Sequence, residues 1–197
     1  MLSLFKKKLF SDKKKLKKFR DRIRLIQKIN KNTLKKDLIS EIKNYLKYED
    51  TPKIIGNNIK KLERYINFYP QNKVCHGDIH FGNIIISKKE LYLLDWDYGL
   101  ISCTGYEIAM FVHLEKLNQK QIKILSEIFE VSIIEIRHYL PICILLDFLY
   151  QNVLFKSIDE KLMEKIESNL EKKNYKPIMV YDEMSSSYLS YAMSVIV

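Results

Sequence analysis

The chain has 197 residues, of which 47% are hydrophobic and 12% aromatic, so it can form one domain with a core and is not intrinsically disordered. No apolar run approaches the ~20 residues that a membrane-spanning helix needs. Three cysteines without a CxxC pair indicate a reduced protein, and we expect a cytoplasmic location. The net charge of +10 comes from residues 1–36, which hold 15 of the 34 Lys and Arg residues.

The basic N-terminus has helical periodicity. Apolar residues at spacings of three and four predict a helix over 13–30, and residues 1–24 are expected to form a basic helical extension. Such a segment could contact nucleic acid or an anionic membrane, but a solvated Lys-rich helix is the more common structure. No motif that reads bases is present, so we expect no specific nucleic-acid partner.

Two more helices are expected before the sequence pattern changes from helical to strand-like. One is predicted to start after Thr33 and one to cover the segment that begins at Ile59 and ends before Pro70. The short apolar runs 84–86 and 91–94, separated by polar residues, then predict a β-hairpin, the strongest strand signal in the chain.

Helices are expected again after the hairpin. One is predicted near 106–117, Asn118 looks like the cap of the next, and Ser132 opens a further helix as the first residue of a capping box. Pro141 should kink or restart that helix, and a charged helix is predicted over about 159–172. The fold class is therefore α+β and mainly helical.

The segment His76-Gly77-Asp78-Ile79-His80-Phe81-Gly82-Asn83 and, after the hairpin, Leu94-Asp95-Trp96-Asp97-Tyr98-Gly99 carry the chemistry. The hairpin should return Asp95 to the side of Asn83, so that three oxygen-bearing side chains converge with Asp78. Hard oxygen ligands suit Mg²⁺. The H-x-D-x-x-x-x-N spacing followed by a metal-binding Asp is the arrangement of protein kinases.

These two segments resemble the catalytic core of the aminoglycoside phosphotransferase and choline kinase family, and the Asp-Trp-Asp-Tyr-Gly form is most similar to the choline and thiamine kinase branches. The resemblance implies a protein-kinase-like C-terminal lobe over residues 25–175. It also implies ATP and Mg²⁺ as cofactors and a hydroxyl of a small polar molecule as substrate. By position, the resemblance makes Asp78 the catalytic base, Asn83 and Asp95 the Mg²⁺ ligands, His76 a brace of the loop, and Glu107 its anchor.

Kinases of this kind begin with a β-rich lobe that contains a Gly-rich loop and a phosphate-binding Lys. Residues 1–70 contain one Gly and no strand–turn–strand pattern. We therefore expect the N-terminal β lobe to be missing, with three explanations: a truncated product, a degenerate kinase, or one piece of a split protein whose partner chain supplies that lobe. An inactive pseudokinase that acts as a binding module is the alternative to the enzyme.

Three residues at the end of the hairpin are candidates for binding a cationic substrate: Trp96, Asp97 and Tyr98. Packing of the hairpin end, with a metal contact by Asp97, explains them equally well. A zinc pair of His76 and His80 lacks further ligands. The tail 176–197 is a separate segment, and its last sixteen residues resemble the start of the DNA gyrase A protein.

Overall fold

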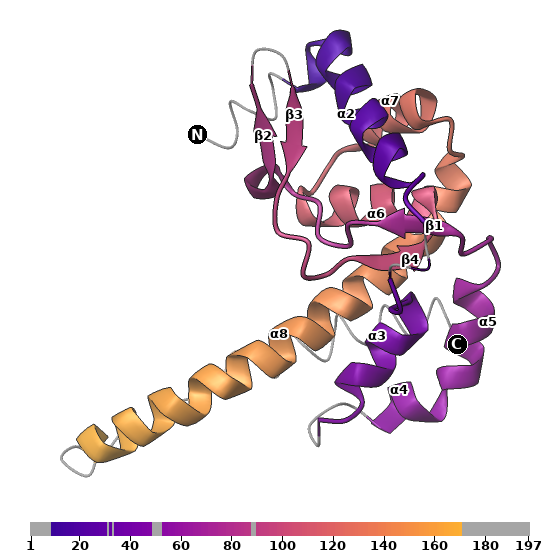
Figure 1. The fold of residues 1–197 in the computed structure, drawn as a ribbon. Coiled ribbons are helices and arrows are strands. Elements are labelled where there is room, and N and C mark those ends of the chain that lie inside the picture. The colour runs from indigo at the N-terminus through magenta and orange to yellow at the C-terminus, as the bar shows by residue number, and fades with distance from the viewer. Residues whose placement is uncertain (1–8, 31, 33, 49–52, 88–89, 171–197) are drawn as a thin grey trace.

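The computed structural model describes residues 9–170 except 31, 33, 49–52 and 88–89, and it describes no side chains at 54 and 154–170. Figure 1 shows helices on both sides of two small sheets, with the hairpin at one end and the last helix extending away at the other. The elements in chain order are α2 (Lys13–Ile26), α3 (Leu38–Tyr45), α4 (Lys53–Asn57), α5 (Ile59–Ile66), β1 (Lys73–Cys75), the 3-10 turn η2 (Phe81–Asn83), β2 (Ile84–Ile86), β3 (Leu91–Leu93), β4 (Leu100–Ser102), α6 (Thr104–Leu114), α7 (Gln119–Phe129) and α8 (Ile133–Leu170).

The predicted hairpin is confirmed. Strands β2 and β3 pair antiparallel, with Ile85 opposite Tyr92 on the exposed face. A second antiparallel pair joins β1 to β4, with Val74 opposite Ile101, and it was not predicted. All four strands have three residues, but β1 and β4 lie far apart in the sequence, so no turn between them signals a hairpin. This second sheet matters because the loop that carries Asp78 leaves from the end of β1.

The helix N-termini follow their capping residues. Asp12 accepts hydrogen bonds from the backbone of Lys14 and Lys15 at the start of α2. Asn118 caps α7, as predicted, and forms a capping box with Gln121. The Ser132 hydroxyl accepts a hydrogen bond from the Glu135 backbone, which is one half of the predicted capping box, while the Glu135 side chain accepts from the Gly105 backbone.

Helix α3 begins later than predicted. We expected it to start after Thr33, but it starts at Leu38, behind an Asp37 cap whose side chain and backbone exchange hydrogen bonds with Ser40. The helix begins at Leu38 and not earlier because Asp37, the N-cap residue, has extended backbone geometry.

One hydrophobic core joins the N-terminal helix to the helices around α6. Phe19 of α2 is fully buried, and its ring centre lies 5.2 Å from that of Phe111 and 5.6 Å from that of Phe129. The lysines of α2 lie on its other faces, which gives an amphipathic helix. The domain boundaries predicted at residues 24 and 175 stay predictions, and residue 175 lies outside the described residues. The apolar face of α2 belongs to the same core as α6 and α7.

Helix α8 spans Ile133–Leu170 as one element, so Pro141 does not restart it and the charged segment expected over 159–172 is its continuation up to residue 170. The first turns of α8 pack closely against α6. Within the described part of the chain, no helix is apolar over a length that could cross a membrane. The tail 176–197 and its resemblance to gyrase lie outside the described residues.

Candidate active site

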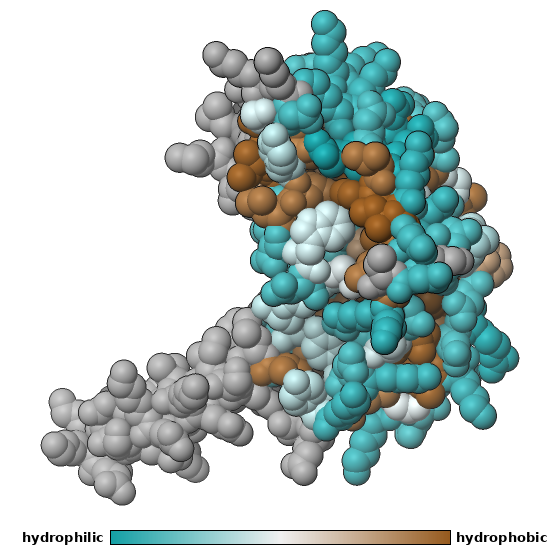
Figure 2. Space-filling model, viewed as in Figure 1, coloured by the Kyte–Doolittle hydropathy of each residue, from teal (hydrophilic) through white to brown (hydrophobic). Residues whose placement is uncertain are grey.

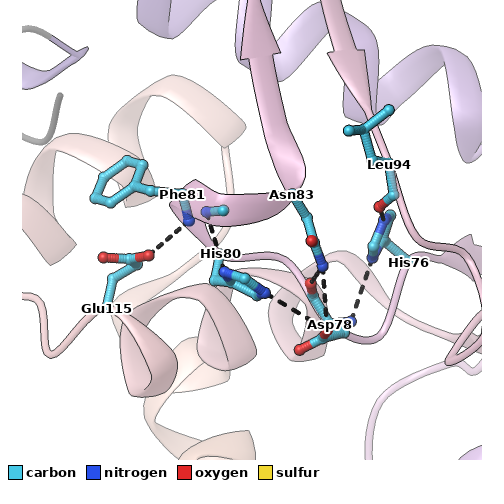
Figure 3. A network of polar contacts seen from close by, with 8 residues as sticks. His76, Asp78, His80, Phe81, Asn83, Leu94 and Glu115 are labelled. Carbon is cyan, nitrogen blue, oxygen red and sulfur yellow. Dashed lines mark hydrogen bonds and ion pairs between the residues drawn. The ribbon is translucent and has the colours of Figure 1, made fainter. Parts of the chain in front are cut away.

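The loop between β1 and η2 is fixed by a buried histidine (Figure 3). The His76 ring Nε2 lies 2.7 Å from the backbone oxygen of Leu94, and its Nδ1 accepts a hydrogen bond of 3.4 Å from the Asp78 backbone. Burial lowers the pKa of His76, so the ring stays neutral, with its proton on Nε2 and its acceptor on Nδ1. His76 thus links the start of this loop to the residue that precedes Asp95. With both ring nitrogens engaged, His76 is a poor zinc ligand.

Asp78 lies at the mouth of the loop with its side chain 28% exposed. Its carboxylate accepts a hydrogen bond of 3.1 Å from the Asn83 Nδ2, and its backbone oxygen accepts a second one of 3.0 Å from the same nitrogen. The His80 Nε2 lies 3.7 Å from the carboxylate. Burial raises the pKa of Asp78, against the opposing effect of the two histidines and Asn83. The group is therefore a stronger proton acceptor than an exposed aspartate.

Asn83 and Asp95 are brought together by the hairpin, as the sequence predicted. The Leu94 backbone N–H donates a hydrogen bond of 2.9 Å to the Asn83 backbone oxygen, and Asp95 follows directly. Asp95 has a φ of 60°, in the left-handed region where a residue other than glycine is uncommon. Unusual backbone geometry of this kind is concentrated at functional sites. Because the Asn83 nitrogen is engaged with Asp78, its Oδ1 is the atom left to bind a cation.

Two glutamates anchor the loop by accepting hydrogen bonds from its backbone. Glu107 of α6 is 1% exposed, and its two oxygens accept hydrogen bonds of 2.9 Å from the His76 backbone and 3.3 Å from the Gly77 backbone. Burial raises the pKa of Glu107 to about 7. Glu115, at the C-terminal end of α6, accepts a hydrogen bond of 2.6 Å from the Phe81 backbone (Figure 3). The anchoring contact expected of Glu107 is present, whereas sequence reasoning missed Glu115.

The donor set fits Mg²⁺ better than a soft metal. Over the described residues, no three His, Cys, Asp or Glu side chains converge in a manner that could enclose a metal ion. The site instead offers the Asn83 amide oxygen and the Asp95 carboxylate beside Asp78. Mg²⁺ binds through one or two carboxylates and takes its other ligands from water and phosphate. An open site with few protein ligands therefore suits a magnesium–nucleotide complex.

Asp78 also lines a pocket of about 100 Å³. Helix α3 contributes Glu41 and Tyr45 to its wall, and α8 contributes Asp147 and Tyr150. The segment after the hairpin adds Tyr98. The pocket therefore combines carboxylates with tyrosines, and it is built from segments that lie far from the loop in sequence, on both sides of it.

Each of the outer carboxylates has a partner. The Lys36 Nζ lies 2.8 Å from Glu41. The His113 Nε2 lies 2.9 Å from the Asp147 Oδ2, and this hydrogen bond lowers the pKa of Asp147. Three carboxylates line the pocket and, among the described residues, no Lys or Arg does, so a cation is the charge that the pocket favours.

Of the three residues predicted to bind substrate, one lines the pocket, and a binding role for all three stays a prediction. Tyr98 lines the pocket, but Trp96 and Asp97 are not among its lining residues. The Trp96 ring packs 4.5 Å from that of His76, and its Nε1 donates to the Leu93 oxygen. Glu41, Tyr45, Asp147 and Tyr150 line the pocket but were not predicted from the sequence. The sequence held one signal for them, because Asp147 interrupts an apolar helical run.

The surface beside the site is apolar. Exposed large side chains occupy the outer face of the hairpin and its end: Ile85 and Tyr92 at 48%, Leu94 at 43% and Trp96 at 38%. Figure 2 shows brown surface on this side of the molecule, above a hollow and next to the hydrophilic surface of α2. The candidate cation ligands therefore lie next to a face that an aromatic ring or another apolar surface could cover.

Comparisons with known proteins show which family and fold this chain resembles. Choline kinase B1 of Caenorhabditis elegans is 35% identical over 72 residues, which are 32% of this chain and 19% of that protein. A choline/ethanolamine kinase family protein of Mesorhizobium loti has a similar structure, with a TM-score of 0.63 at 13% identity over 96% of this chain and 63% of the other. LicA in complex with AMP gives a TM-score of 0.60 at 16% identity, covering 95% and 63%.

The structural neighbours confirm the mainly helical, kinase-like fold class. The chain spans 63% of the length of these two structures and a smaller share of the curated relative. The family model for choline/ethanolamine kinase matches residues 5–141, which is more than half of the sequence. The chain therefore belongs to the choline/ethanolamine kinase family.

Proposed function

We propose that this chain carries the catalytic base, the metal ligands and the acceptor pocket of an ATP- and Mg²⁺-dependent kinase that phosphorylates a hydroxyl of a small cation. One observation supports this most strongly: Asp78 is hydrogen-bonded to the Asn83 amide on one side and lines a carboxylate-rich pocket on the other. An acceptor in the pocket would thus lie between the base and the cation ligands. The family assignment favours an enzyme over a binding module.

Asp78 is the residue that takes the hydroxyl proton. Its raised pKa makes it a better acceptor, while the His80 and Asn83 contacts keep the carboxylate oriented. A general base of this kind acts in the transition state as the oxygen–phosphorus bond forms. Asp78 would take up the hydroxyl proton, the bond between the γ-phosphorus of ATP and the β–γ bridging oxygen would break, and ADP would leave as the phosphoryl group moves to the substrate oxygen.

Asn83 and Asp95 would hold Mg²⁺. The bound ion would neutralise charge on the phosphates and align the transferred group with the acceptor. The chain contributes the position of these two ligands, through the Leu94–Asn83 backbone hydrogen bond and the His76 brace.

The nucleotide would lie on the hairpin side of the site. The exposed Ile85, Tyr92 and Leu94 offer apolar surface next to Asp95, where an adenine ring could pack. One structural neighbour contains AMP, which supports a nucleotide here. The β-rich lobe that would cover the phosphates, and a partner chain that supplies it, stay predictions, as does a cytoplasmic location.

The acceptor candidates are choline, thiamine and amino sugars, each of which has a hydroxyl and a cationic group. Glu41 and Asp147 supply negative charge at the pocket wall, and Tyr45, Tyr98 and Tyr150 supply aromatic and hydroxyl contacts. The names of the relatives make choline the first acceptor to try.

Transfer from labelled ATP to a panel of alcohols tests the proposal. The panel contains choline, ethanolamine, thiamine, an amino sugar and an uncharged diol, each with and without Mg²⁺. We expect labelled product from one or more cationic alcohols, only with Mg²⁺, and no product from the diol. Product from the uncharged diol alone, or equal product without Mg²⁺, would contradict the proposal.

A further inference from the structure

Asp147 lines the pocket from helix α8, and not from the loop that carries Asp78. It lies on α8, within the part of that helix whose side chains are described, and it lines the same pocket as Asp78. Its Oδ2 accepts from the His113 Nε2 at 2.9 Å, and its Oδ1 accepts from the Gln151 Nε2 at 3.3 Å. Two bonds from two directions fix the plane of the carboxylate. Asp147 is therefore an oriented acceptor and not a mobile surface charge.

Asp147 is ionised at neutral pH. The hydrogen bond from His113 lowers its pKa, and Lys116 acts in the same direction. A carboxylate has about four acceptor positions, of which His113 and Gln151 use two. Because the side chain is 34% exposed and lines the pocket, acceptor capacity remains for a ligand. This differs from Asp78, whose pKa is raised and whose oxygen must receive a proton during transfer.

Small cations differ in how they are recognised. A primary, secondary or tertiary ammonium carries at least one N–H and forms a charge-assisted hydrogen bond with a carboxylate. A quaternary ammonium has no N–H and binds best over the faces of aromatic rings. The balance of oriented carboxylates and open aromatic faces in a pocket therefore decides between the two.

The aromatic faces of this pocket are partly occupied. Tyr98 and Tyr150 meet edge to face, with ring centres 5.6 Å apart and planes at 87°. The Lys36 Nζ lies over the Tyr98 ring, 5.7 Å from its centre, where it would repel a second cation. These contacts leave less open aromatic face for a quaternary group, whereas Asp147 stays available to an N–H donor.

We propose that Asp147 is a specificity-determining residue that selects acceptor alcohols whose ammonium group carries an N–H over quaternary ones. The inference rests on the proposed function, since it places the cationic end of the acceptor in the same pocket. His113 and Gln151 act as positioning residues for the Asp147 carboxylate. Ethanolamine and its N-methyl derivatives are then the preferred chemical class, with choline bound less well.

A methylation series measures this directly. Ethanolamine, its N-methyl and N,N-dimethyl forms, and choline are all cations at neutral pH, and only choline lacks an N–H. Calorimetric titration of the full chain with each amine gives four dissociation constants. We expect the step from the dimethyl form to choline to weaken binding about tenfold, as the loss of a charged hydrogen bond does.

The Asp147→Asn variant separates recognition from packing. Asn is nearly isosteric and can still accept the His113 hydrogen bond, so the fold should survive. The variant should bind the dimethyl form and choline within about twofold of each other, and Asp21→Asn, an exposed change on α2, should keep the wild-type ratio. If wild type binds choline as tightly as the dimethyl form, or binds no amine, the inference is wrong. The same holds if Asp147→Asn keeps the full ratio.

The same samples distinguish this inference from the proposed function. Transfer of phosphate from ATP to any cationic alcohol is measured in parallel. Transfer to choline with no preference for N–H donors would overturn the role of Asp147 alone. Selective amine binding that Asp147→Asn removes, without Mg²⁺-dependent transfer to any alcohol, would support Asp147 and overturn the proposed reaction.

Discussion

The two walls of the candidate site are built in different ways. The loop wall comes from one stretch of chain, from His76 to Asp95, closed by backbone hydrogen bonds and anchored by Glu107. The helical wall comes from α3 and α8, whose contributions Glu41 and Asp147 are brought together only by packing. Local chemistry thus fixes the proposed phosphate side, and long-range packing fixes the proposed acceptor side.

This contrast has a functional meaning. In the proposed function, the loop wall would perform a reaction step that does not depend on which alcohol is phosphorylated. The helical wall would meet the variable part of the substrate, so exchange of a few side chains on α3 or α8 should change specificity without disturbing the catalytic loop. Perturbing the two walls should therefore give separable effects.

The largest effect should follow loss of the base. Asp78→Asn removes the proton acceptor but keeps the size of the side chain, so phosphoryl transfer should fall by about 10²–10⁴-fold. The melting temperature should be unchanged within error, since the Asn83 bond to the Asp78 backbone remains. Steady-state rates on the preferred alcohol, with Asp21→Asn as control, measure this. Substantial turnover by Asp78→Asn would show that the assigned role is wrong.

The anchor of the loop wall predicts a pH dependence of stability. Burial raises the pKa of Glu107 from 4.5 to about 7, so the folded chain binds a proton that the unfolded chain releases. This contribution is fully present below pH 4.5 and is lost as pH rises through about 7, amounting to a change on the order of 3 kcal/mol. Denaturant unfolding of wild type and Glu107→Gln across this range measures it. Parallel stability curves for the two proteins would contradict the prediction.

A glycine tests how tightly the loop wall is packed. Gly77 has a φ of 80°, and a Cβ there would lie 2.2 Å from the Tyr98 backbone oxygen. Gly77→Ala should therefore destabilise the fold by about 2 kcal/mol or more. Gly56→Ala on α4 is the matched control, because a Cβ at that position would meet no atom within 4 Å, and it should be neutral or stabilise by about 1 kcal/mol. Equal melting temperatures of the two variants would argue against a strained Gly77.

The smallest effect should come from the helical wall. Tyr150 packs edge to face on Tyr98 in the pocket, so Tyr150→Leu should raise the KM for the acceptor about fivefold and leave kcat nearly unchanged. Tyr48→Leu, at an exposed position outside the pocket, is the control. An equal fall in kcat would show that Tyr150 acts in the reaction step and not only in acceptor binding. That result would contradict separate roles for the two walls.

The loop wall was predictable from the sequence. The spacing from His76 to Asn83 and the hairpin that returns Asp95 are local. The structure joins Asn83 to Asp78 and places the backbone before Asp95 beside Asn83, while the metal-binding roles of Asn83 and Asp95 stay predictions. The capping residues Asn118 and Ser132 were also found, because a cap depends on neighbours within three residues.

The helical wall was not predictable in the same way. Glu41 and Tyr45 lie far before Asp78 in the sequence and Asp147 far after it, so no local pattern links them. The β1–β4 pair was missed because its two strands lie far apart in sequence, whereas the equally short β2 and β3 are joined by a polar turn. Pro141 was expected to kink or restart a helix; α8 continues as a single element through that position, so the helix does not restart there, and a kink stays a prediction.

Calorimetric titration with ATP, with and without Mg²⁺, tests the central claim that Asn83 and Asp95 form a magnesium–nucleotide site. We predict binding by wild type that requires Mg²⁺. We also predict that Asp95→Asn, which keeps a residue tolerant of the left-handed backbone, weakens this binding by about tenfold or more. No binding by wild type, or binding that is independent of Mg²⁺ and unaffected by Asp95→Asn, would contradict the claim.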